Sequence, residues 1–284
     1  MPRKPAITLI GPGNLGSALG LALHRAGYRI GEMVTRAAAD AQVRALARRV
    51  EARAMPAARA TFADPVVWIC VQDSAIAPLA ADLARRGNWK GKLVLHSSGA
   101  LGSRELAPLR KAGAAVASAH PMMSFVRGVE PDWRGVPFAL EGDARAVAFA
   151  RRVARELGGT SFILAAKAKP LYHAFGAFAS PLVVAELAVM EKVAASAGLS
   201  VHDARRAIVP ILRQTLRNYE RGGPAGAFSG PLVRGDVATV RRHLQELKRI
   251  PLARQVYVAL ARAALRTLPV RARQDMERLL GDGT

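Results

Sequence analysis

The first 27 residues hold the pattern that most restricts how this chain can fold. A short apolar run at residues 6–10 ends in Gly11-Pro12-Gly13-Asn14-Leu15-Gly16. Apolar residues then recur at helical spacing until Gly27, so the glycines stand between a predicted strand and a predicted helix. In that context, the spacing G-x-G-x-x-G predicts a parallel α/β sheet with a dinucleotide bound at its first turn.

Each glycine of this turn has its own expected role. Gly11 permits the tight turn, Gly13 lets the backbone approach a pyrophosphate, and Gly16 lets the helix pack closely on the strand. The N-terminus of the helix, with Asn14 and Leu15, then faces the phosphates. We therefore predict that all five of these residues contact a cofactor. A glycine-rich turn without a ligand is the alternative.

The end of the second strand indicates which dinucleotide is bound. We expect this strand at residues 29–34, followed by Thr35 and Arg36 where NAD-binding folds usually carry an acid. A hydroxyl and a guanidinium can hydrogen-bond a 2′-phosphate, which an acid would repel. Glu32 lies two or three residues too early on the strand to fill that place, and only a different register of the strand would bring it there. The sequence therefore predicts NADP as cofactor, with a solvated surface arginine as the alternative for Arg36.

Three later apolar runs predict strands that end in polar residues, at 66–71, 92–95 and 114–119. The carboxyl ends of parallel strands form the binding crevice of such a sheet. We expect Val71, Gln72 and Ser97 to contact the cofactor, and Ser98 and His120 to orient a small substrate. A helix cap is the alternative for the two serines, and a structural role is the alternative for His120 and for its neighbour in the crevice, His96.

The second half of the chain changes character. Strands at 136–140 and 160–164 flank a helix at about 143–157 and complete a doubly wound, mostly parallel α/β sheet. From Pro170 onward the patterns are helical. A chain of 284 residues suggests two domains at about 150 residues each. We therefore predict an NADP-binding Rossmann domain over residues 1–164 and an all-helical substrate and dimerisation domain over residues 165–284.

The helical half opens with a long segment, predicted as one helix over residues 170–197 with a kink at Pro181. Its middle is apolar almost all round, which places it at the centre of the domain or in a subunit contact. Lys169, Tyr172 and His173, at its start, are candidates for proton transfer beside a nicotinamide. Packing at the domain junction is the alternative for Tyr172 and His173.

Charge and cysteine content exclude several classes of protein. The 42 Lys and Arg against 21 Asp and Glu give a net charge of +21, which attracts any anion. We find no aromatic-basic RNA-binding motif, and so expect no nucleic-acid function. The single cysteine, Cys70, allows no internal disulfide, and no Cys/His cluster has metal-ligand spacing. The apolar runs fall short of the roughly 20 residues of a spanning helix, and no secretory leader is evident, so we expect a cytoplasmic protein without membrane contact.

Several local motifs occur together in one order, and their combination resembles a known family. They are the glycine turn, His96-Ser97-Ser98-Gly99-Ala100, His120-Pro121, Tyr172-His173 and the loop from Gly230-Pro231 to Asp236. Over nearly its whole length, the chain resembles the bacterial Rossmann-like NADP oxidoreductases with a helical C-terminal domain of unknown function. More distantly it resembles β-hydroxyacid dehydrogenases, ketopantoate reductases and pyrroline-carboxylate reductases. The resemblance implies a dinucleotide cofactor and a homodimer formed through the helical domain.

In the β-hydroxyacid dehydrogenases, a Lys and an Asn one helical turn apart serve the reacting oxygen. Lys169 and His173 have that spacing here, with His in place of Asn. The predicted function is an NADP(H)-dependent oxidoreductase that transfers hydride to or from a small carbonyl, alcohol or imine substrate bound between the two domains. The alternatives are a non-catalytic NADP-binding sensor or regulatory dimer, and a basic nucleic-acid-binding protein. A deazaflavin partner, which related folds use, is also open.

Overall fold

The computed structural model describes residues 4–281, which fall into two units. Residues up to Phe178 form unit 1, and residues from Ala179 form unit 2. The division lies inside helix α6 (Lys169–Ala179), whereas the boundary predicted from the sequence lies before that helix, between residues 164 and 165.

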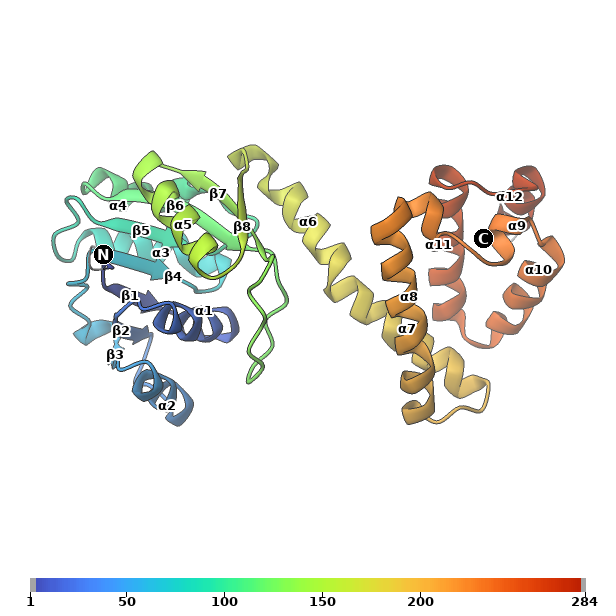
Figure 1. The fold of residues 1–284 in the computed structure, drawn as a ribbon, viewed down its shortest axis with the longest axis horizontal. Helices are drawn as coiled ribbons and strands as arrows, with labels where there is room; N and C mark the ends of the chain where they lie inside the picture. Colours follow the sequence, from blue (N-terminus) through green and yellow to red (C-terminus); the bar gives the residue numbers. More distant parts are fainter. Residues whose placement is uncertain (1–3, 282–284) are drawn as a thin grey trace. The chain divides into compact units, whose positions relative to one another are not determined.

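Unit 1 is built on one sheet (Figure 1). Within residues 4–281 the sheet has eight strands in the order β3-β2-β1-β4-β5-β6-β7-β8, and every neighbouring pair is parallel except β6 with β7. The strands are β1 (Ile7–Ile10), β2 (Ile30–Thr35), β3 (Arg53–Pro56), β4 (Val66–Ile69), β5 (Leu93–His96), β6 (Ala115–Pro121), β7 (Pro137–Gly142) and β8 (Thr160–Ile163). The predicted doubly wound, mostly parallel sheet is therefore confirmed, with β3 as a strand that the sequence did not predict.

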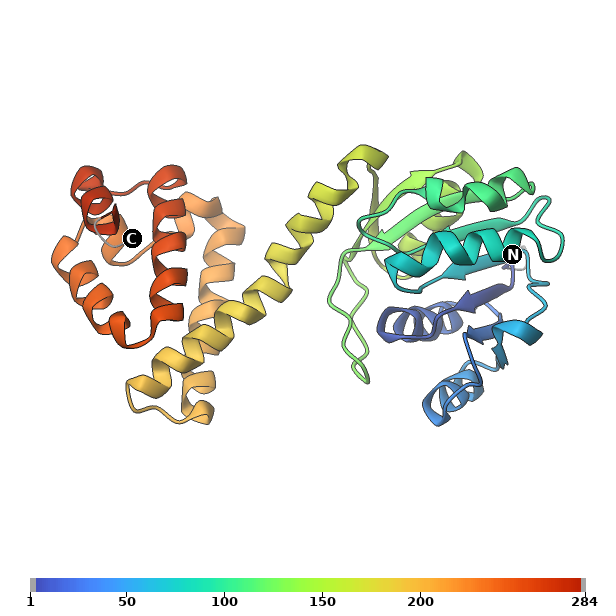
Figure 2. The same ribbon diagram turned by 180° about the vertical axis from the view of Figure 1, so that it is seen from behind.

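Helices cover both faces of this sheet, as Figures 1 and 2 show from opposite sides. One face carries α1 (Asn14–Arg25), α2 (Ala41–Arg49) and α5 (Ala144–Glu156), and the other carries α3 (Asp73–Ala84) and α4 (Ala107–Lys111). Each layer encloses its own hydrophobic core. Because both faces are covered, strands such as β1 and β4 are buried at every residue, which explains their uninterrupted apolar sequences.

Unit 2 consists of helices. They are α7 (Pro181–Ser196), α8 (Val201–Ala227), α9 (Pro231–Arg234), α10 (Val237–Glu246), α11 (Pro251–Thr267) and α12 (Arg273–Gly281). Short 3₁₀ turns lie at Ala57–Arg59, Ser103–Leu106 and Ala166–Ala168 in unit 1, and at Leu247–Arg249 in unit 2. Ser200 caps α8 by accepting from the Asp203 amide, and Asp236 caps α10 by accepting from the Thr239 amide. Buried side chains of α10, α11 and α12 form the core of this unit.

The apolar segment at residues 170–197 differs from its prediction in one respect. The kink at Pro181 is present, since the helix is interrupted at Ser180 (φ −134°, ψ −80°) and Pro181 begins α7. No residue of α7 is buried, however, and Val184 is 63% exposed. A place at the centre of the domain is therefore wrong for the single chain. The prediction that every apolar run falls short of a spanning helix does not hold for Ala166–Ser196, which by length and composition alone could cross a membrane. The core helices of soluble proteins pass the same test, but they are mostly buried, whereas the apolar window of this stretch is not.

Candidate functional site

The glycine turn lies between β1 and α1, as predicted, and two of its glycines are sterically required. Gly11 has a positive φ of 83°, and a Cβ there would lie 2.8 Å from Val71 Cγ1. A Cβ on Gly16 would collide with the carbonyl oxygen of Gly11 and would lie 3.1 Å from Cys70 Cβ. These close contacts hold the N-terminus of α1 against the ends of β1 and β4.

Gly13 lies in a different environment. A Cβ at this position would meet no atom within 4 Å, so the space in front of its backbone is open. No side chain caps the N-terminus of α1, and its first turn has no acidic residue. The first amide groups of a helix lack intrahelical acceptors and favour anions. The residues present therefore fit a phosphate group. The side chain of Asn14 is already engaged, because its Nδ2 donates to the Phe125 carbonyl oxygen (3.2 Å).

β2 ends at Thr35, followed by Arg36, and the residue before them contacts the same turn, since the Gly11 amide donates to the Val34 carbonyl oxygen (2.9 Å). The Thr35 hydroxyl donates to the Ala37 carbonyl oxygen (2.6 Å). Arg36 is exposed, and within residues 4–281 its side chain has no hydrogen bond or ion pair. Glu32 is buried, and its carboxylate accepts from Arg53 (3.0 Å) and from Thr61. Its charge is thus held within the fold.

The loop after β4 supplies the next group. Val71 packs against Gly11, and Gln72 is an exposed residue directly before α3. Ser97, after β5, has its hydroxyl inside the protein, where it accepts from Trp68 Nε1 (2.8 Å). The Cys70 Sγ lies 3.8 Å from the same hydroxyl, and burial raises the pKa of the thiol to about 12. The Ser97 hydroxyl therefore joins two neighbouring strands.

His96, the last residue of β5, has a structural environment. Its Nδ1 accepts from the Ser98 amide (3.1 Å), so Nε2 carries the proton and donates to the Gly102 carbonyl oxygen (3.0 Å). Burial lowers its pKa to about 4, and the ring is neutral at physiological pH. The Ser98 hydroxyl accepts from the amides of Ala100 and Leu101. Both side chains shape the loop between β5 and the following turn.

Lys169 is almost completely buried, with 1% of its surface exposed. Its Nζ donates to the Ser98 carbonyl oxygen (3.0 Å) and to Ser118 Oγ (2.9 Å). Burial lowers the pKa of the ammonium group to about 8. The buried lysine therefore connects the loop after β5 to strand β6 through its two hydrogen bonds, and its ammonium group does not project into open space.

The side chains of His120, Tyr172 and His173 lie close together near that lysine. His120 Nδ1 lies 3.0 Å from the Tyr172 hydroxyl, with the rings perpendicular. The His173 ring centroid is 6.0 Å from that of His120. Burial, together with the positive charge of Lys169, lowers the pKa of His120 to about 3, and burial raises the pKa of Tyr172 to about 12. At neutral pH the pair is a neutral imidazole and a protonated phenol.

Gly99 and Ser118 also belong to this group, although the sequence analysis did not select them. A Cβ on Gly99 would lie 2.5 Å from His173 Cδ2 and 2.8 Å from His120 Nε2, so both imidazoles lie over a bare backbone. Ser118 lies two residues before His120 on β6, and residues two apart on a strand share a face. That alternation was a signal for Ser118; no local signal marked Gly99 apart from its place in a polar loop.

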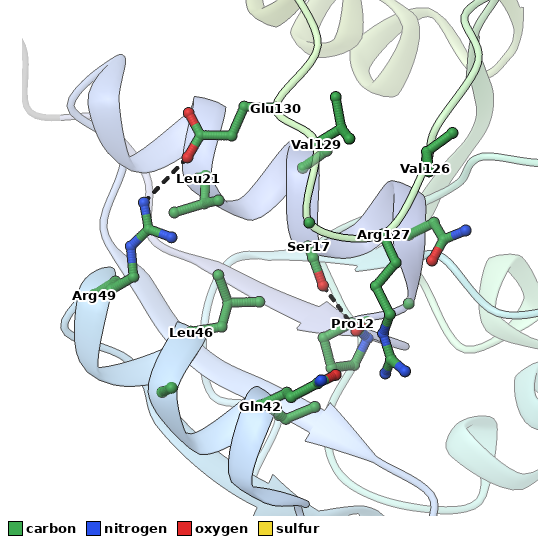
Figure 3. A pocket seen from close by; sticks show the side chains of 16 residues that line it. Pro12, Ser17, Leu21, Gln42, Leu46, Arg49, Val126, Arg127, Val129 and Glu130 are labelled. Carbon is green, nitrogen blue, oxygen red and sulfur yellow. Dashed lines mark hydrogen bonds and ion pairs between the residues drawn. The ribbon is translucent and has the colours of Figure 1, made fainter. Parts of the chain in front are cut away.

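A cavity of about 330 Å³ lies beside the glycine turn (Figure 3). It is bounded by the glycine turn, by α1, by α2 and by the loop at residues 126–130. Within residues 4–281, no group of three or more His, Cys, Asp or Glu residues is placed to hold a metal ion.

Comparison with known families agrees with this architecture. Residues 2–121 match the Rossmann-like domain family, and residues 136–264 match DUF2520, a domain family of unknown function. The DUF2520 match begins at the start of β7, inside unit 1. A comparison with the curated proteins finds no match.

Solved structures share the fold over almost the whole chain. A protein from Bacteroides fragilis, described as a candidate NADP oxidoreductase, is 23% identical over 92% of this chain and 98% of its own, with a TM-score of 0.78. A Thermotoga maritima protein is 23% identical over 96% of this chain and 99% of its own, with a TM-score of 0.70. A reductive aminase from Aspergillus terreus was solved with NADPH and ethyl-5-oxohexanoate. It is 17% identical over 97% of this chain and 99% of its own, with a TM-score of 0.59.

These likenesses establish a shared fold and confirm the resemblance predicted from the sequence motifs. The neighbouring structures include NADP oxidoreductases, and one of them contains NADPH itself. The chain therefore combines a match to the Rossmann-like domain family with a C-terminal match to DUF2520.

Proposed function

We propose that this protein is an NADP(H)-dependent oxidoreductase that transfers hydride to or from a carbonyl, alcohol or imine carbon. The observation that carries the proposal is that two separate features lie where strands of one α/β sheet end. The first is an uncapped helix N-terminus with open space at Gly13. The second is the hydrogen-bonded pair of His120 and Tyr172, in which His120 lies near the carboxyl end of β6. Ligands of doubly wound sheets bind at such carboxyl ends.

The cofactor side of the proposal rests on the glycine turn. The amides of the first turn of α1, including those of Asn14 and Leu15, would hold the pyrophosphate, since no side chain in the described part of the chain caps them. Arg36, exposed and without a partner in the described part of the chain, would bind the 2′-phosphate. When bound, NADPH supplies the hydride, and the chain must supply the proton.

The His120–Tyr172 pair can hold that proton in either tautomer. If the Tyr172 hydroxyl donates to Nδ1, then Nε2 of His120 carries a hydrogen over Gly99. If Nδ1 carries the hydrogen instead, the phenol keeps its own proton, because its pKa is raised to about 12. In reduction, hydride adds to the substrate carbon and the π electrons move to its oxygen or nitrogen. That atom then takes the proton from the pair.

Lys169 and His173 support this chemistry from two sides. The Lys169 ammonium holds the Ser98 loop, and burial together with the positive charge of Lys169 keeps His120 neutral. His173 is exposed next to His120, where it can hydrogen-bond a substrate. Lys169 is therefore a positioning residue in this proposal, and the proton donors are His120 and Tyr172.

The test is a set of small carbonyl and imine substrates, with oxidation of NADPH followed by absorbance. The Tyr172→Phe variant keeps the ring and removes the hydroxyl, and we expect turnover to fall about 100-fold with NADPH affinity unchanged. Unit 2 offers a matched control, because the Tyr257 hydroxyl lies 3.2 Å from His243 Nδ1 in the same perpendicular arrangement. Tyr257→Phe should leave turnover unchanged. Equal turnover of Tyr172→Phe and the parent would refute the assignment.

The preference for NADP is tested separately at Arg36. The Arg36→Ala variant should bind NADPH about tenfold more weakly, while its affinity for NADH should not change, since only NADPH carries the 2′-phosphate. Equal NADPH affinity in the variant and the parent would remove the preference.

A non-catalytic NADP-binding sensor is the second candidate. Two predicted catalytic residues favour it, because the Lys169 ammonium and the Ser98 hydroxyl are both engaged inside the protein. In that case NADPH would raise the melting temperature, but no substrate would be reduced. The substrate set above therefore separates the two candidates.

We also propose that the protein forms a homodimer through its helical part. The support is a set of large apolar side chains that are exposed in the single chain, among them Leu182, Val184, Ile211 and Leu216. Exposed apolar area of this kind marks an interaction surface. Sedimentation equilibrium should give twice the chain mass. A monomer in buffer, with binding to lipid vesicles, would instead favour a membrane contact. The cytoplasmic location stays a prediction.

A further inference from the structure

The segment at residues 122–135, between β6 and β7, lies across the helices that follow β1 and β2, and we call it the strap. Near its start, the Phe125 carbonyl oxygen accepts from Asn14 in the glycine turn. Further along, Glu130 pairs with Arg25 of α1 (2.6 Å) and with Arg49 of α2 (3.0 Å). Near its end, Trp133 packs against Phe125 within the strap and stacks on Phe138 of β7, with ring centroids 5.6 and 5.9 Å apart. The strap is thus fastened at several points along its length.

The strap also closes one side of the cavity beside the glycine turn. Pro12 and Gly13 line this cavity, as do residues of α1 and α2, and the strap contributes residues 126–130. Figure 3 shows the Arg127 side chain running from the strap toward Pro12 and Gln42. The cavity volume, about 330 Å³, is in the range of small-molecule sites.

Arg127 differs from the other arginine that lines the cavity. Arg49 is paired with Glu130, whereas Arg127 has no hydrogen bond or ion pair within residues 4–281. Glu130 stays ionised, because Arg25 and Arg49 hold its pKa below the usual range. The charged side chains that line the cavity are therefore two arginines and one glutamate, a net of +1.

We propose that Arg127 is a cofactor-recognition residue whose guanidinium binds a phosphate of the dinucleotide held at Gly13. This inference rests on the proposed function. The cation faces a cavity that also contains the open glycine and the uncapped end of α1, and both of these favour an anion. A guanidinium gives phosphate two parallel hydrogen bonds, and the fastened strap fixes where it stands.

Calorimetric titration of the full chain with NADPH tests the proposal. The Arg127→Ala variant should raise the Kd for NADPH about tenfold, which is about 1.4 kcal/mol. Arg134→Ala is the matched control: Arg134 ends the same strap and carries the same charge, but it binds Asp132. Its Kd should stay within about twofold of the parent value. Arg127→Lys, which keeps the charge but not the paired hydrogen bonds, should fall between the two.

NADH identifies the phosphate that Arg127 contacts. If Arg127→Ala weakens NADPH and NADH alike, the contact is to the shared pyrophosphate. If it weakens NADPH alone, the contact is to the 2′-phosphate. Unchanged affinity for both cofactors, in a parent protein that binds NADPH, overturns this inference and leaves the proposed function intact. A parent protein that binds neither cofactor refutes the proposed function itself.

A second variant tests whether the strap positions Arg127. Glu130→Gln removes the two ion pairs that fasten the strap without altering the Arg127 side chain itself. We expect it to weaken NADPH binding several-fold with little change in melting temperature, because both partners are surface arginines. NADPH should also slow trypsin cleavage after Arg127 in the parent. Cleavage at the same rate with and without NADPH would contradict contact between the strap and the cofactor.

Discussion

Replacing Gly99 with alanine tests whether the space under the two imidazoles matters. The new Cβ would lie 2.5 Å from His173 Cδ2 and 2.8 Å from His120 Nε2, and real Cβ atoms essentially never show contacts this close. His173 is exposed and can rotate away. His120 is held by Tyr172, so either its ring or the loop must move. Overpacking of this kind costs about 1–3 kcal/mol.

The effect on turnover should exceed the effect on stability. A misplacement of about 1 Å in a catalytic group can cost about 100-fold in rate. We therefore expect Gly99→Ala to lose between ten- and a hundredfold in turnover, while its affinity for NADPH stays close to the parent value. Thermal unfolding and NADPH-dependent turnover, measured on the same preparation, give both quantities.

Gly176 provides the matched control in the same unit. A Cβ there would meet only Met122 Cγ, at 4.0 Å, and the residue lies inside α6. Because alanine is the better helix former, Gly176→Ala should gain up to about 1 kcal/mol. A Gly99→Ala protein as stable and as active as the parent would refute the close approach of the two imidazoles to Gly99. Lost stability with full turnover would show that the imidazoles take no part in the chemistry.

Two further predictions concern buried polar groups. The folded chain releases the Lys169 proton near pH 8, whereas the unfolded chain keeps it to about 10.5, so the free energy of unfolding should rise between these pH values. Urea titrations should show this rise, on the order of 3 kcal/mol, in the parent and not in Lys169→Met; parallel curves would contradict it. Ser97→Ala should destabilise the fold by about 1–3 kcal/mol, because it removes the acceptor of the Trp68 indole; an unchanged unfolding midpoint would show that the bond is dispensable.

Most of the sheet could be predicted from the sequence, because its central strands are apolar without interruption. Strand β3 was missed for a physical reason. It pairs only with β2, and its sequence from Arg53 to Pro56 lacks an apolar run. Proline has no amide hydrogen to donate and is tolerated on such an edge strand, so Pro56 gives no strand signal in the sequence.

The candidate site could be predicted in part. The strand and helix patterns on either side located the glycine turn, and the strand ends located His120. Whether Lys169 points into the protein or out of it depends on contacts with Ser98 and Ser118, which are distant in the sequence. The position of Arg127 likewise depends on distant contacts. It lies in a loop whose sequence has no periodicity, and the ion pairs of Glu130 hold that loop against α1 and α2. Such contacts follow from tertiary packing, which local patterns do not encode.

Calorimetric titration with NADPH, on the parent and on Gly13→Val, is the most direct test of cofactor binding at the glycine turn. The backbone of Gly13 is extended (φ −76°, ψ −156°), and a Cβ would meet no protein atom within 4 Å, so the variant should fold with an unchanged melting temperature. We expect each parent chain to bind one NADPH and Gly13→Val to bind none. No heat from the parent, or equal binding by the variant, would contradict it.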